Sequence, residues 1–302
     1  MFVWNVDPVL FHLPDFLGGR GIRYYGVLYA LTLMLGFYVW QWQMLRGGHT
    51  RKQAERFLTM GVIAVIGGAR LGHCLFYEPE RYLKDPIRIL YFWEGGLASH
   101  GSTIALILVL IYFARTEKMT IREVLDRFSM SAAVGATLIR FGNLMNSEIV
   151  GRITDDPLAV KFPRHDRGAL EACPQACESV ASDVCGFING QCQSFANVPW
   201  RHPSQLYEGA LGIMVFLLLY LVDRHYGEKR PLGLLGFLFI GVYFTGRFVV
   251  EFFKEFQSLE ARESLLTMGQ YLSIPFIIIG YLGVYAALRR REQTPPPAKA
   301  AE

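Results

Sequence analysis

Residues 139–152 read IRFGNLMNSEIVGR and place charged and amide side chains beside strongly apolar ones. Arg140 and Glu148 lie here, at the end of a segment apolar enough to enter a membrane. An arginine at the centre of a membrane helix costs at least ~2.5–3.5 kcal/mol on insertion scales, so it usually faces a partner, a ligand or water. If the segment is helical, Arg140, Asn143 and Ser147 share one face. The pattern predicts a polar site at a membrane, with a structural Arg–Glu clamp as the alternative.

Two other groups combine residue types that do chemistry. Tyr243, Arg247 and Glu251 recur at intervals of four residues and would form one stripe on a helix. An Arg–Glu pair that reaches toward the membrane surface is the structural alternative. His100 stands among small residues at the start of another apolar segment, where a histidine could move a proton near neutral pH. A hydrogen-bonded structural histidine is equally compatible with this position.

Two further polar groups lie at residues 23–26 and 201–209. Pro203 fits a helix start, and Tyr207 and Glu208 enter the apolar segment that follows. For both groups, a helix cap or an anchor at the membrane interface is the favoured interpretation. All five groups map to the same outer half of the membrane under the topology given below. Together their arginines, histidine, tyrosines and carboxylates predict a pocket for an anionic lipid head group.

The elements that must hold these groups are membrane helices. The chain has 302 residues, of which 52% are hydrophobic, and its mean hydropathy is +0.26. These values are typical of a multi-pass membrane protein. The N-terminus lacks the basic region of a signal peptide, so we expect the first apolar segment to stay in the protein. Since about 20 apolar residues cross a bilayer, we expect seven spans, at about 24–45, 57–77, 97–114, 124–145, 205–222, 232–252 and 268–288.

The distribution of Lys and Arg predicts the orientation of these spans. One set of loops holds twice as many basic residues as the opposite set. The richer set comprises 46–56, 115–122, 224–230 and 289–299, and the poorer set comprises 20–23, 81–88 and 254–262. By the positive-inside rule the richer loops are cytoplasmic. We therefore expect an all-α polytopic membrane protein with its N-terminus outside and its C-terminus inside.

The predicted organisation has four parts. Membrane helices 1–4 occupy residues 1–145, with segment 78–96 along the outer surface, and an extracytoplasmic head or ordered loop follows at 146–204. Helices 5–7 occupy 205–290, and 291–302 form a basic, proline-rich cytoplasmic tail that we expect to be disordered. No convincing internal repeat is evident, which argues against a transporter built from repeated halves.

The outer insert contains four closely spaced cysteines, which are Cys173, Cys177, Cys185 and Cys192. Disulfides persist outside the cytoplasmic membrane, so two disulfide bonds with three possible pairings are the favoured interpretation. A zinc site of four thiolates is the alternative, although the spacing lacks paired C-x2-C knuckles. Cys74 falls in the second predicted span and is expected to be a small buried apolar residue.

In combination, these motifs resemble those of bacterial prolipoprotein diacylglyceryl transferases. The resemblance covers about residues 20–290. It rests on the 140–152 segment, His-Pro-Ser-Gln-Leu-Tyr-Glu at 202–208, the Gly-Gly-Leu…His-Gly run at 95–101 and Arg247…Glu251, all in the expected order. It implies seven membrane helices with the N-terminus outside, in the bacterial inner membrane. It also implies transfer of the sn-1,2-diacylglyceryl group from phosphatidylglycerol to the lipobox cysteine of prolipoproteins, with release of glycerol 1-phosphate near the outer leaflet.

The resemblance also implies the functional positions, which are Tyr25, His100, Arg140, Asn143, Glu148, Gly151, Tyr243, Arg247 and Glu251. Arg140 matches the residue with which the family binds phosphatidylglycerol. The expected partners are this lipid, prolipoprotein signal peptides and the bilayer, whereas no metal, cofactor or nucleic acid is expected. Two features depart from the family pattern. Ser102 stands where the family commonly has glycine, and the outer insert is longer and carries cysteines.

The implied reaction is substitution at the glycerol C3 of the lipid by a cysteine thiolate. His100 is the first candidate for the base, although it could merely orient a partner while another group takes the proton. Arg140 and Arg247 would stabilise the departing phosphate, which requires their guanidinium groups to lie on the same side of the membrane. Glu148 and Glu251 are expected to orient these arginines, and Asn143 and Tyr25 to position the lipid.

Three other functions are compatible with parts of the pattern. A transporter or flippase for anionic lipids would use the same arginines without forming a covalent product. An intramembrane protease is less well supported, because the Gly-x-Ser-x-Gly motif is absent from the sequence. A structural membrane protein would tolerate replacement of both arginines.

Overall fold

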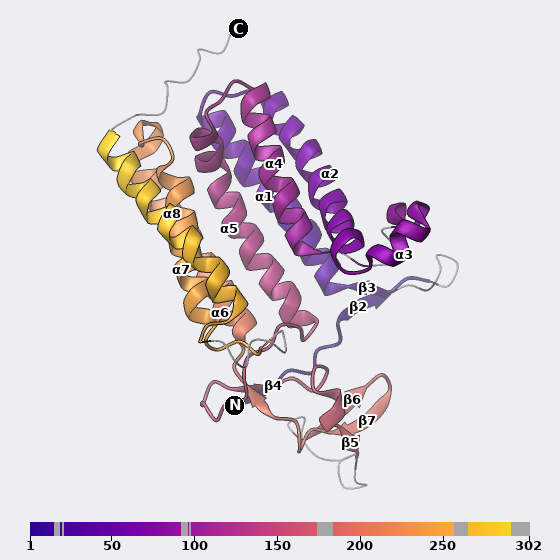
Figure 1. Cartoon of the computed structure of the whole chain (residues 1–302). Coiled ribbons are helices and arrows are strands. Elements are labelled where there is room, and N and C mark those ends of the chain that lie inside the picture. Colours follow the sequence, from indigo (N-terminus) through magenta and orange to yellow (C-terminus); the bar gives the residue numbers. More distant parts are fainter. Residues whose placement is uncertain are drawn as a thin grey trace. The chain divides into compact units, whose positions relative to one another are not determined.

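The computed structural model describes residues 1–14, 19, 21–91, 96, 98–173, 184–256 and 265–290. Long helices and short strands make up these residues (Figure 1). The chain divides into two compact units. The first unit comprises Met1–Gly36, Ala132–Leu221 and Leu238–Leu282, and the second comprises Phe37–Ser131, Val222–Phe237 and Gly283–Glu302. Five of the long helices contribute residues to both units.

A helix covers most of each of the seven segments predicted as spans. They are α1 (Tyr24–Arg46), α2 (Arg51–Phe76), α4 (Ser99–Thr116), α5 (Ile121–Met145), α6 (Ser204–Tyr226), α7 (Leu234–Val250) and α8 (Met268–Arg290). Within the described residues, three helical segments are long and apolar enough to cross a membrane, namely Arg51–Phe76, Ser204–Lys229 and Met268–Arg290. Shorter apolar stretches cover His100–Thr116 and Leu234–Val250. The mostly helical, apolar fold is that of a membrane protein.

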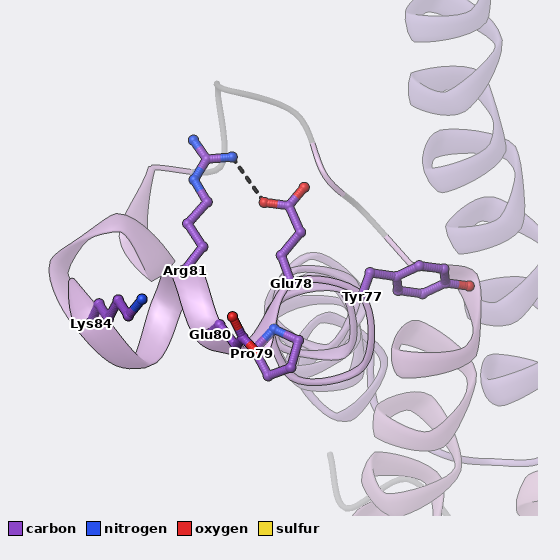
Figure 2. A pocket seen from close by; sticks show the side chains of 6 residues that line it. All are labelled: Tyr77, Glu78, Pro79, Glu80, Arg81 and Lys84. Carbon is purple, nitrogen blue, oxygen red and sulfur yellow. Dashed lines mark hydrogen bonds and ion pairs between the residues drawn. The ribbon is translucent and has the colours of Figure 1, made fainter.

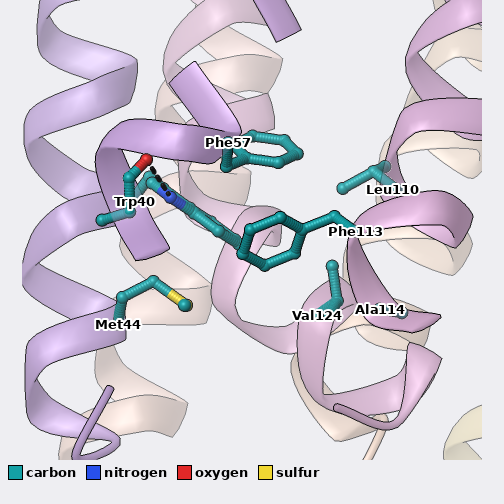
Figure 3. Packing of buried hydrophobic residues seen from close by; sticks show 8 residues of the cluster. Trp40, Met44, Phe57, Leu110, Phe113, Ala114 and Val124 are labelled. Carbon is teal, nitrogen blue, oxygen red and sulfur yellow. Dashed lines mark hydrogen bonds between the residues drawn. The ribbon is translucent and has the colours of Figure 1, made fainter. Parts of the chain in front are cut away.

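An aromatic cluster forms the core of the second unit (Figure 3). The Trp40 ring lies 4.3 Å from that of Phe57 and 5.6 Å from that of Phe113, measured between centroids. The indole Nε1 of Trp40 donates a hydrogen bond to the carbonyl of Ala54 at 3.3 Å. A buried indole needs such an acceptor, so this contact fixes α1 against the first turn of α2. That turn is closed by a capping box between Thr50 and Gln53.

Ion pairs and hydrogen bonds of two buried aspartates join four helix ends in the second unit. Arg230 Nη1 lies 3.0 Å from Asp223 Oδ1, and both side chains are fully buried. Asp223 also pairs with Arg46 at the end of α1. Asp126, near the start of α5, accepts hydrogen bonds from the backbone of Gly233 at 2.7 Å and Gly236 at 2.8 Å. It thereby satisfies donors at the start of α7 that no residue within that helix can pair.

Short strands occur outside the long helices. β1 (Phe2–Val3) runs parallel to β4 (Val160–Lys161), which pairs antiparallel with β8 (Trp200–Arg201). β2 (Val9–His12) and β3 (Gly21–Arg23) form an antiparallel pair. The third sheet has the order β5 (Glu171–Ala172), β7 (Gln191–Ser194), β6 (Cys185–Ile188). The prediction of an all-α fold was therefore wrong for the N-terminal residues and the 146–204 insert, because strands of two to four residues leave little periodicity in a sequence.

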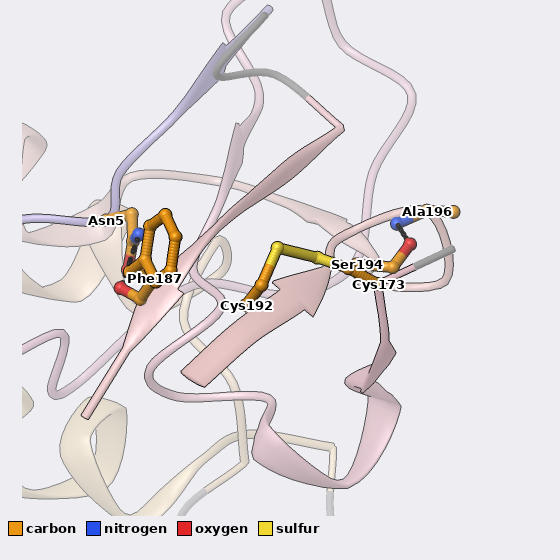
Figure 4. The surroundings of a disulfide bond; sticks show 6 residues. All are labelled: Asn5, Cys173, Phe187, Cys192, Ser194 and Ala196. Atoms are coloured by element: carbon orange, nitrogen blue, oxygen red, sulfur yellow. Dashed lines mark hydrogen bonds between the residues drawn. A yellow bond between two sulfur atoms is a disulfide. The ribbon is translucent and has the colours of Figure 1, made fainter. Parts of the chain in front are cut away.

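A disulfide bond fastens the third sheet (Figure 4). It joins Cys173, directly after β5, to Cys192 in β7, and their Cα atoms lie 5.5 Å apart. Cys185 is also disulfide-bonded, whereas Cys177 lies outside the described residues. The zinc alternative is thus wrong, since Cys173, Cys185 and Cys192 are disulfide-bonded. Cys74 is a free, buried thiol in α2, as predicted.

Replacing Cys173 with serine is expected to loosen the β5–β7–β6 sheet. The disulfide closes a loop between residues 19 apart in sequence, and loops of this size contribute about 3 kcal/mol when cross-linked. Limited proteolysis with mass spectrometry should show faster cleavage within 184–195 in the variant. Cys74→Ala, which removes a thiol that forms no disulfide, serves as the control. Equal cleavage of both variants and the wild type would contradict this stabilising role.

A surface element follows α2 and contains α3 (Pro79–Lys84) and η2 (Pro86–Leu90). A pocket of about 500 Å³ is lined by Tyr77, Glu78, Pro79, Glu80, Arg81 and Lys84 (Figure 2). Arg81 donates to Glu78 at 2.9 Å, and this hydrogen bond lowers the pKa of Glu78. Arg70 of α2 holds the element by donating to the carbonyls of Ile89 at 3.0 Å and Arg88 at 2.6 Å. None of the predicted site residues lines this pocket.

Candidate active site

The polar segment 139–152 is only partly helical. α5 ends at Met145, and the chain then enters left-handed backbone at Ser147 (φ 53°) and Ile149 (φ 56°). Ser147 N–H donates to Leu144 at 3.0 Å, and Glu148 N–H donates to Asn143 at 2.9 Å. These bonds form a Schellman motif that ends the helix. The condition under which Ser147 would share the helical face of Arg140 is therefore not met, and the helix ends at Met145 as the predicted span 124–145 does.

The turn after α5 is strained and is held from outside. Left-handed backbone at a β-branched residue such as Ile149 is a genuine outlier and costs roughly 1–3 kcal/mol. Two fully buried side chains at the start of α6 oppose that cost. Ser204 Oγ donates to the carbonyl of Ile149 at 2.7 Å, and Gln205 Nε2 donates to that of Glu148 at 2.7 Å. Strain of this kind, fixed by its surroundings, is typical of functional sites.

Gly151 follows the turn and contacts two other segments of the chain, at His202 and at Phe253. Its N–H donates to His202 at 2.9 Å, and its carbonyl accepts from Arg201 Nη1 at 3.2 Å. A Cβ atom here would stand 2.3 Å from the carbonyl oxygen of His202 and 2.7 Å from that of Phe253. Real Cβ contacts essentially never fall below 3.0 Å, so only glycine fits. Gly151 thus joins the turn to the segments that precede α6 and follow α7.

Arg201 stabilises this junction through hydrogen bonds to two carboxylates. It donates to both carboxylate oxygens of Asp166, at 2.7 and 2.8 Å, and to Glu255 at 3.0 Å. Burial lowers the pKa of Arg201, but the Asp166 and Glu255 carboxylates outweigh it and raise the pKa above its usual value. A two-pronged arginine–carboxylate contact of this kind fixes both position and orientation.

Arg140 projects from the last turns of α5 and pairs with a carboxylate on α6. Its Nε lies 3.0 Å from Glu208 Oε2, where the two side chains are 13% and 3% exposed. Its Nη1 donates to Asn143 Oδ1 at 3.3 Å. Glu148 was expected to orient Arg140, but it is exposed and accepts from Asn146 at 3.2 Å. The helix end at Met145 carries Glu148 away from the α5 face, so the short-range pairing was wrong.

The ion pair continues from Glu208 to the end of α7. Lys254 Nζ lies 3.8 Å from Glu208 Oε1 and 3.2 Å from Glu251 Oε2. Both Lys254 and Glu251 are buried. Glu251 therefore pairs with Lys254 rather than with Arg247, because the chain turns directly after α7 and brings Lys254 back over it. A Cβ at Gly269, in the first turn of α8, would lie 2.5 Å from the Glu251 carboxyl carbon.

Tyr25 joins the same cluster from the start of α1. Its ring packs on the backbone of α5, since a Cβ at Gly142 would lie 2.9 Å from Tyr25 Cδ2. The phenol lies within electrostatic range of both Glu148 and Arg140. The structure thus brings together Tyr25, Arg140, Asn143, Glu148, Gly151 and Glu251, six of the nine predicted positions.

Tyr243 and Arg247 lie on α7, about two turns and one turn before Glu251 respectively. The Tyr243 ring stacks on Phe239 at a centroid distance of 5.4 Å. The Arg247 side chain is half-buried and makes no hydrogen bond or ion pair within the described part of the chain. Its backbone carbonyl accepts a hydrogen bond from Glu251 N–H at 3.0 Å. The backbone of Arg247 is therefore joined to the cluster at the end of α7. Close approach of its guanidinium to that of Arg140 stays a prediction.

His100 belongs to the second unit, in the first turn of α4. Its side chain is exposed. The helix around it is tightly fixed to α2, since a Cβ at Gly101 would lie 2.0 Å from the carbonyl oxygen of Gly68. Ser102 Oγ donates to the carbonyl of Val65 at 2.8 Å. The serine that departs from the family pattern therefore fits and adds a bond between the two helices, which holds His100 on a rigid element.

Comparisons with known proteins agree with this arrangement. A sequence profile of the prolipoprotein diacylglyceryl transferase family matches residues 8–286. The chain belongs to this family. Similar relatives named phosphatidylglycerol–prolipoprotein diacylglyceryl transferase come from Tolumonas auensis (36% identical, 93% of this chain and 95% of that protein) and Chloroherpeton thalassium (36%, 96% and 95%). A third, from Vibrio cholerae, is 34% identical over 95% of this chain and 93% of its own.

For this member of the diacylglyceryl transferase family, sequence reasoning missed four residues of the cluster. They are Ser204, Gln205, Glu208 and Lys254. The 201–209 group was interpreted as a helix cap with interfacial anchors, although Glu208 stands inside an apolar segment. An ionisable residue in that setting signals a buried partner, and this signal could have identified Glu208. Nothing in the sequence indicates that Lys254 folds back onto it.

Proposed function

We propose that the protein transfers the sn-1,2-diacylglyceryl group of phosphatidylglycerol to the lipobox cysteine of prolipoproteins, the first step of lipoprotein maturation. The relatives carry the name of this activity. One observation carries the proposal furthest. Arg140 is held through Nε by Glu208 and through Nη1 by Asn143, while Nη2 has no hydrogen-bond partner within the described residues. A guanidinium fixed in this way can bind a phosphate.

The reaction is a substitution at the glycerol C3 of the lipid. The cysteine thiolate forms a C–S bond there as the C3–O bond to phosphate breaks. The bonding electrons leave with the oxygen, so glycerol 1-phosphate departs as an anion and a thioether remains. Negative charge grows on the phosphate in the transition state, and cations already in place stabilise it without reorganising. Arg140 and Arg247 supply that charge, while Asn143, Tyr243 and Tyr25 position the lipid around them.

The proton of the thiol must leave before or during the attack. A free cysteine has a pKa of about 8.5, so a base assists near neutral pH. His100 is exposed and lies on a helix start fixed to α2. Its type and setting suit a proton acceptor. Its role as the base is part of the proposal.

Replacing His100 with glutamine is expected to lower transfer by about 10²–10⁴-fold, the usual contribution of a positioned base. The reason is that glutamine keeps a hydrogen-bonding side chain but cannot accept the proton. The measurement is the pH dependence of the rate with a lipobox peptide and phosphatidylglycerol. The wild type should lose activity on the acid side, as expected for a reaction that needs a free base, and the variant should lack that limb. Near-normal turnover with an unchanged profile would exclude the imidazole as the base.

For the membrane arrangement we propose seven spans with the N-terminus and residues 146–204 outside and the C-terminus inside. The excess of Lys and Arg in one set of loops supports this orientation. Contacts within the first unit join the starts of α1, α6 and α8 to the ends of α5 and α7. Those within the second unit join the ends of α1 and α6 to the starts of α5 and α7. Successive antiparallel spans produce this alternation.

Two observations support an external, inner-membrane site facing the outer leaflet. Disulfide bonds occur in the 146–204 insert, and such bonds persist in oxidising compartments. The strained turn and Gly151 lie within this insert, and Glu208 follows its last residue by four positions. The partners proposed are phosphatidylglycerol, prolipoprotein signal peptides and the bilayer.

The decisive experiment is mass spectrometry of a lipobox peptide incubated with the purified protein and phosphatidylglycerol. A peptide whose mass increases by one diacylglyceryl group, together with released glycerol phosphate, is the expected result. The same peptide with its cysteine replaced by serine is the control. Lipid movement across vesicles without an adduct would instead indicate a transporter, and the proposed function would be wrong.

A further inference from the structure

Glu208 and Lys254 form a buried pair of opposite charges beside Arg140. We infer that Glu208 is a positioning residue: it holds the Arg140 guanidinium by its Nε so that Nη1 and Nη2 face the lipid phosphate, and Lys254 balances the charge of Glu208 from the opposite side. The inference rests on the proposed function for the identity of the phosphate. It assigns roles to two residues outside the nine functional positions implied by the family resemblance.

The contact geometry divides the guanidinium into two edges. Glu208 Oε2 occupies the Nε position at 3.0 Å. Nη1 makes a long hydrogen bond to Asn143 at 3.3 Å, and no described residue accepts from Nη2. A purely structural clamp would use the donors of the arginine more completely, whereas Nη2 stays open within the described residues. The free donors are those of one edge, which can bind two oxygens of a phosphate.

The charges around Glu208 explain how a carboxylate persists in an apolar setting. Its two oxygens make no hydrogen bond within the described residues, and they lie near Arg140 on one side and Lys254 on the other. Burying an ionised carboxylate is favourable only with close opposite charges. Lys254 in turn contacts Glu251 at 3.2 Å. The charges alternate in sign along this row of contacts, from Arg140 through Glu208 and Lys254 to Glu251. The four charges therefore sum to zero before the substrate binds.

The helix register of α6 places Glu208 at the arginine. Ser204 and Gln205, in the first turn, bind the carbonyls of the strained turn. Glu208 follows four and three residues later, and side chains at these spacings share a helix face. The same face therefore holds both the turn after α5 and the Arg140 side chain. This coupling makes the position of Arg140 depend on α6 as well as on α5.

The test uses the full-length protein in detergent micelles and two substitutions. Glu208→Gln keeps the shape but loses the charge, and Glu208→Asp keeps the charge on a side chain one methylene shorter. We expect Glu208→Gln to raise the KM for phosphatidylglycerol roughly tenfold or more, as expected for loss of a charged contact, and Glu208→Asp to recover part of that loss. In an Arg140→Ala background, Glu208→Gln should add little further loss, because its effect acts through the arginine.

Glu123→Gln is the matched control, since Glu123 is another buried glutamate, paired with Arg127 and His49 in the second unit. It should lower the unfolding temperature and leave the KM unchanged. The inference is overturned if Glu208→Gln lowers stability but keeps the wild-type KM and kcat. It is also overturned if the effects of Arg140→Ala and Glu208→Gln add independently.

A second readout separates this inference from the proposed function. The rise in unfolding temperature on adding phosphatidylglycerol reports binding without any transfer. If the wild-type protein forms no peptide adduct, the proposed function fails, and the rise alone decides the inference. A smaller rise in Glu208→Gln than in the wild type and Glu123→Gln supports a positioning role. An equal rise in all three overturns it.

Discussion

Replacing Arg140 with alanine is expected to lower transfer by about 10²–10³-fold, the usual effect of removing one donor that stabilises a developing anion. The substitution removes the free guanidinium edge beside Asn143, and among the described residues Glu208 then keeps the charge of Lys254, 3.8 Å away. Arg140→Lys should recover little activity, because an ammonium group is a point charge and cannot reproduce the planar fork. The measurement is kcat/KM for phosphatidylglycerol with a lipobox peptide. Full activity in both variants would exclude binding of the lipid phosphate by Arg140.

Loss of stability must be separated from loss of chemistry in this experiment. Breaking a buried ion pair from one side destabilises a protein because the remaining charge stays buried. The double variant Arg140→Ala/Glu208→Gln removes that stranded charge. We expect it to unfold at a higher temperature than Arg140→Ala while remaining equally inactive. Recovery of transfer along with stability would mean that Arg140 is structural.

The helices could be predicted from the sequence because their signal is strong and local. Apolar runs of about 20 residues gave 24–45 and 268–288, and the helices cover Tyr24–Arg46 and Met268–Arg290. The start of α2 was placed six residues late, at 57 instead of Arg51. Its first turn is polar, and the capping box of Thr50 and Gln53 rather than burial extends the helix there.

The sequence indicated which residues belong to the candidate site, but not which of them contact each other. Charged residues in apolar segments singled out Arg140 and Arg247, because ionisable groups in membranes usually have a partner or a function. The partner of Arg140 was sought nearby, at Glu148, whereas it is Glu208 on another helix. Spacing along one helix constrains neighbours at three and four residues, but contacts between helices depend on packing that spacing does not encode. The left-handed turn at Ser147 and Ile149 was hidden for the same reason, since contacts from α6 hold it.

Replacing Gly151 with alanine is expected to lower transfer by about 10²-fold, the effect of displacing reactive groups by about 1 Å. The added methyl would meet the carbonyl oxygens of His202 and Phe253 at 2.3 and 2.7 Å. Both obstacles are backbone atoms, so a side chain cannot rotate away and the segments themselves must shift. One segment leads into α6 and Glu208, and the other leads into Lys254. The methyl therefore separates the two residues that contact each other beside Arg140.

Gly168→Ala provides the matched control for Gly151→Ala. Gly168 lies in the same unit, and a Cβ there would meet no atom within 4 Å. The measurements are kcat/KM for phosphatidylglycerol and the unfolding temperature of each variant in detergent. Gly151→Ala should lower both, since overpacking costs about 1–3 kcal/mol, and Gly168→Ala should match the wild type. Wild-type transfer by Gly151→Ala would mean that the junction of the turn with residues 202 and 253 does not set the geometry of Arg140 and Glu208.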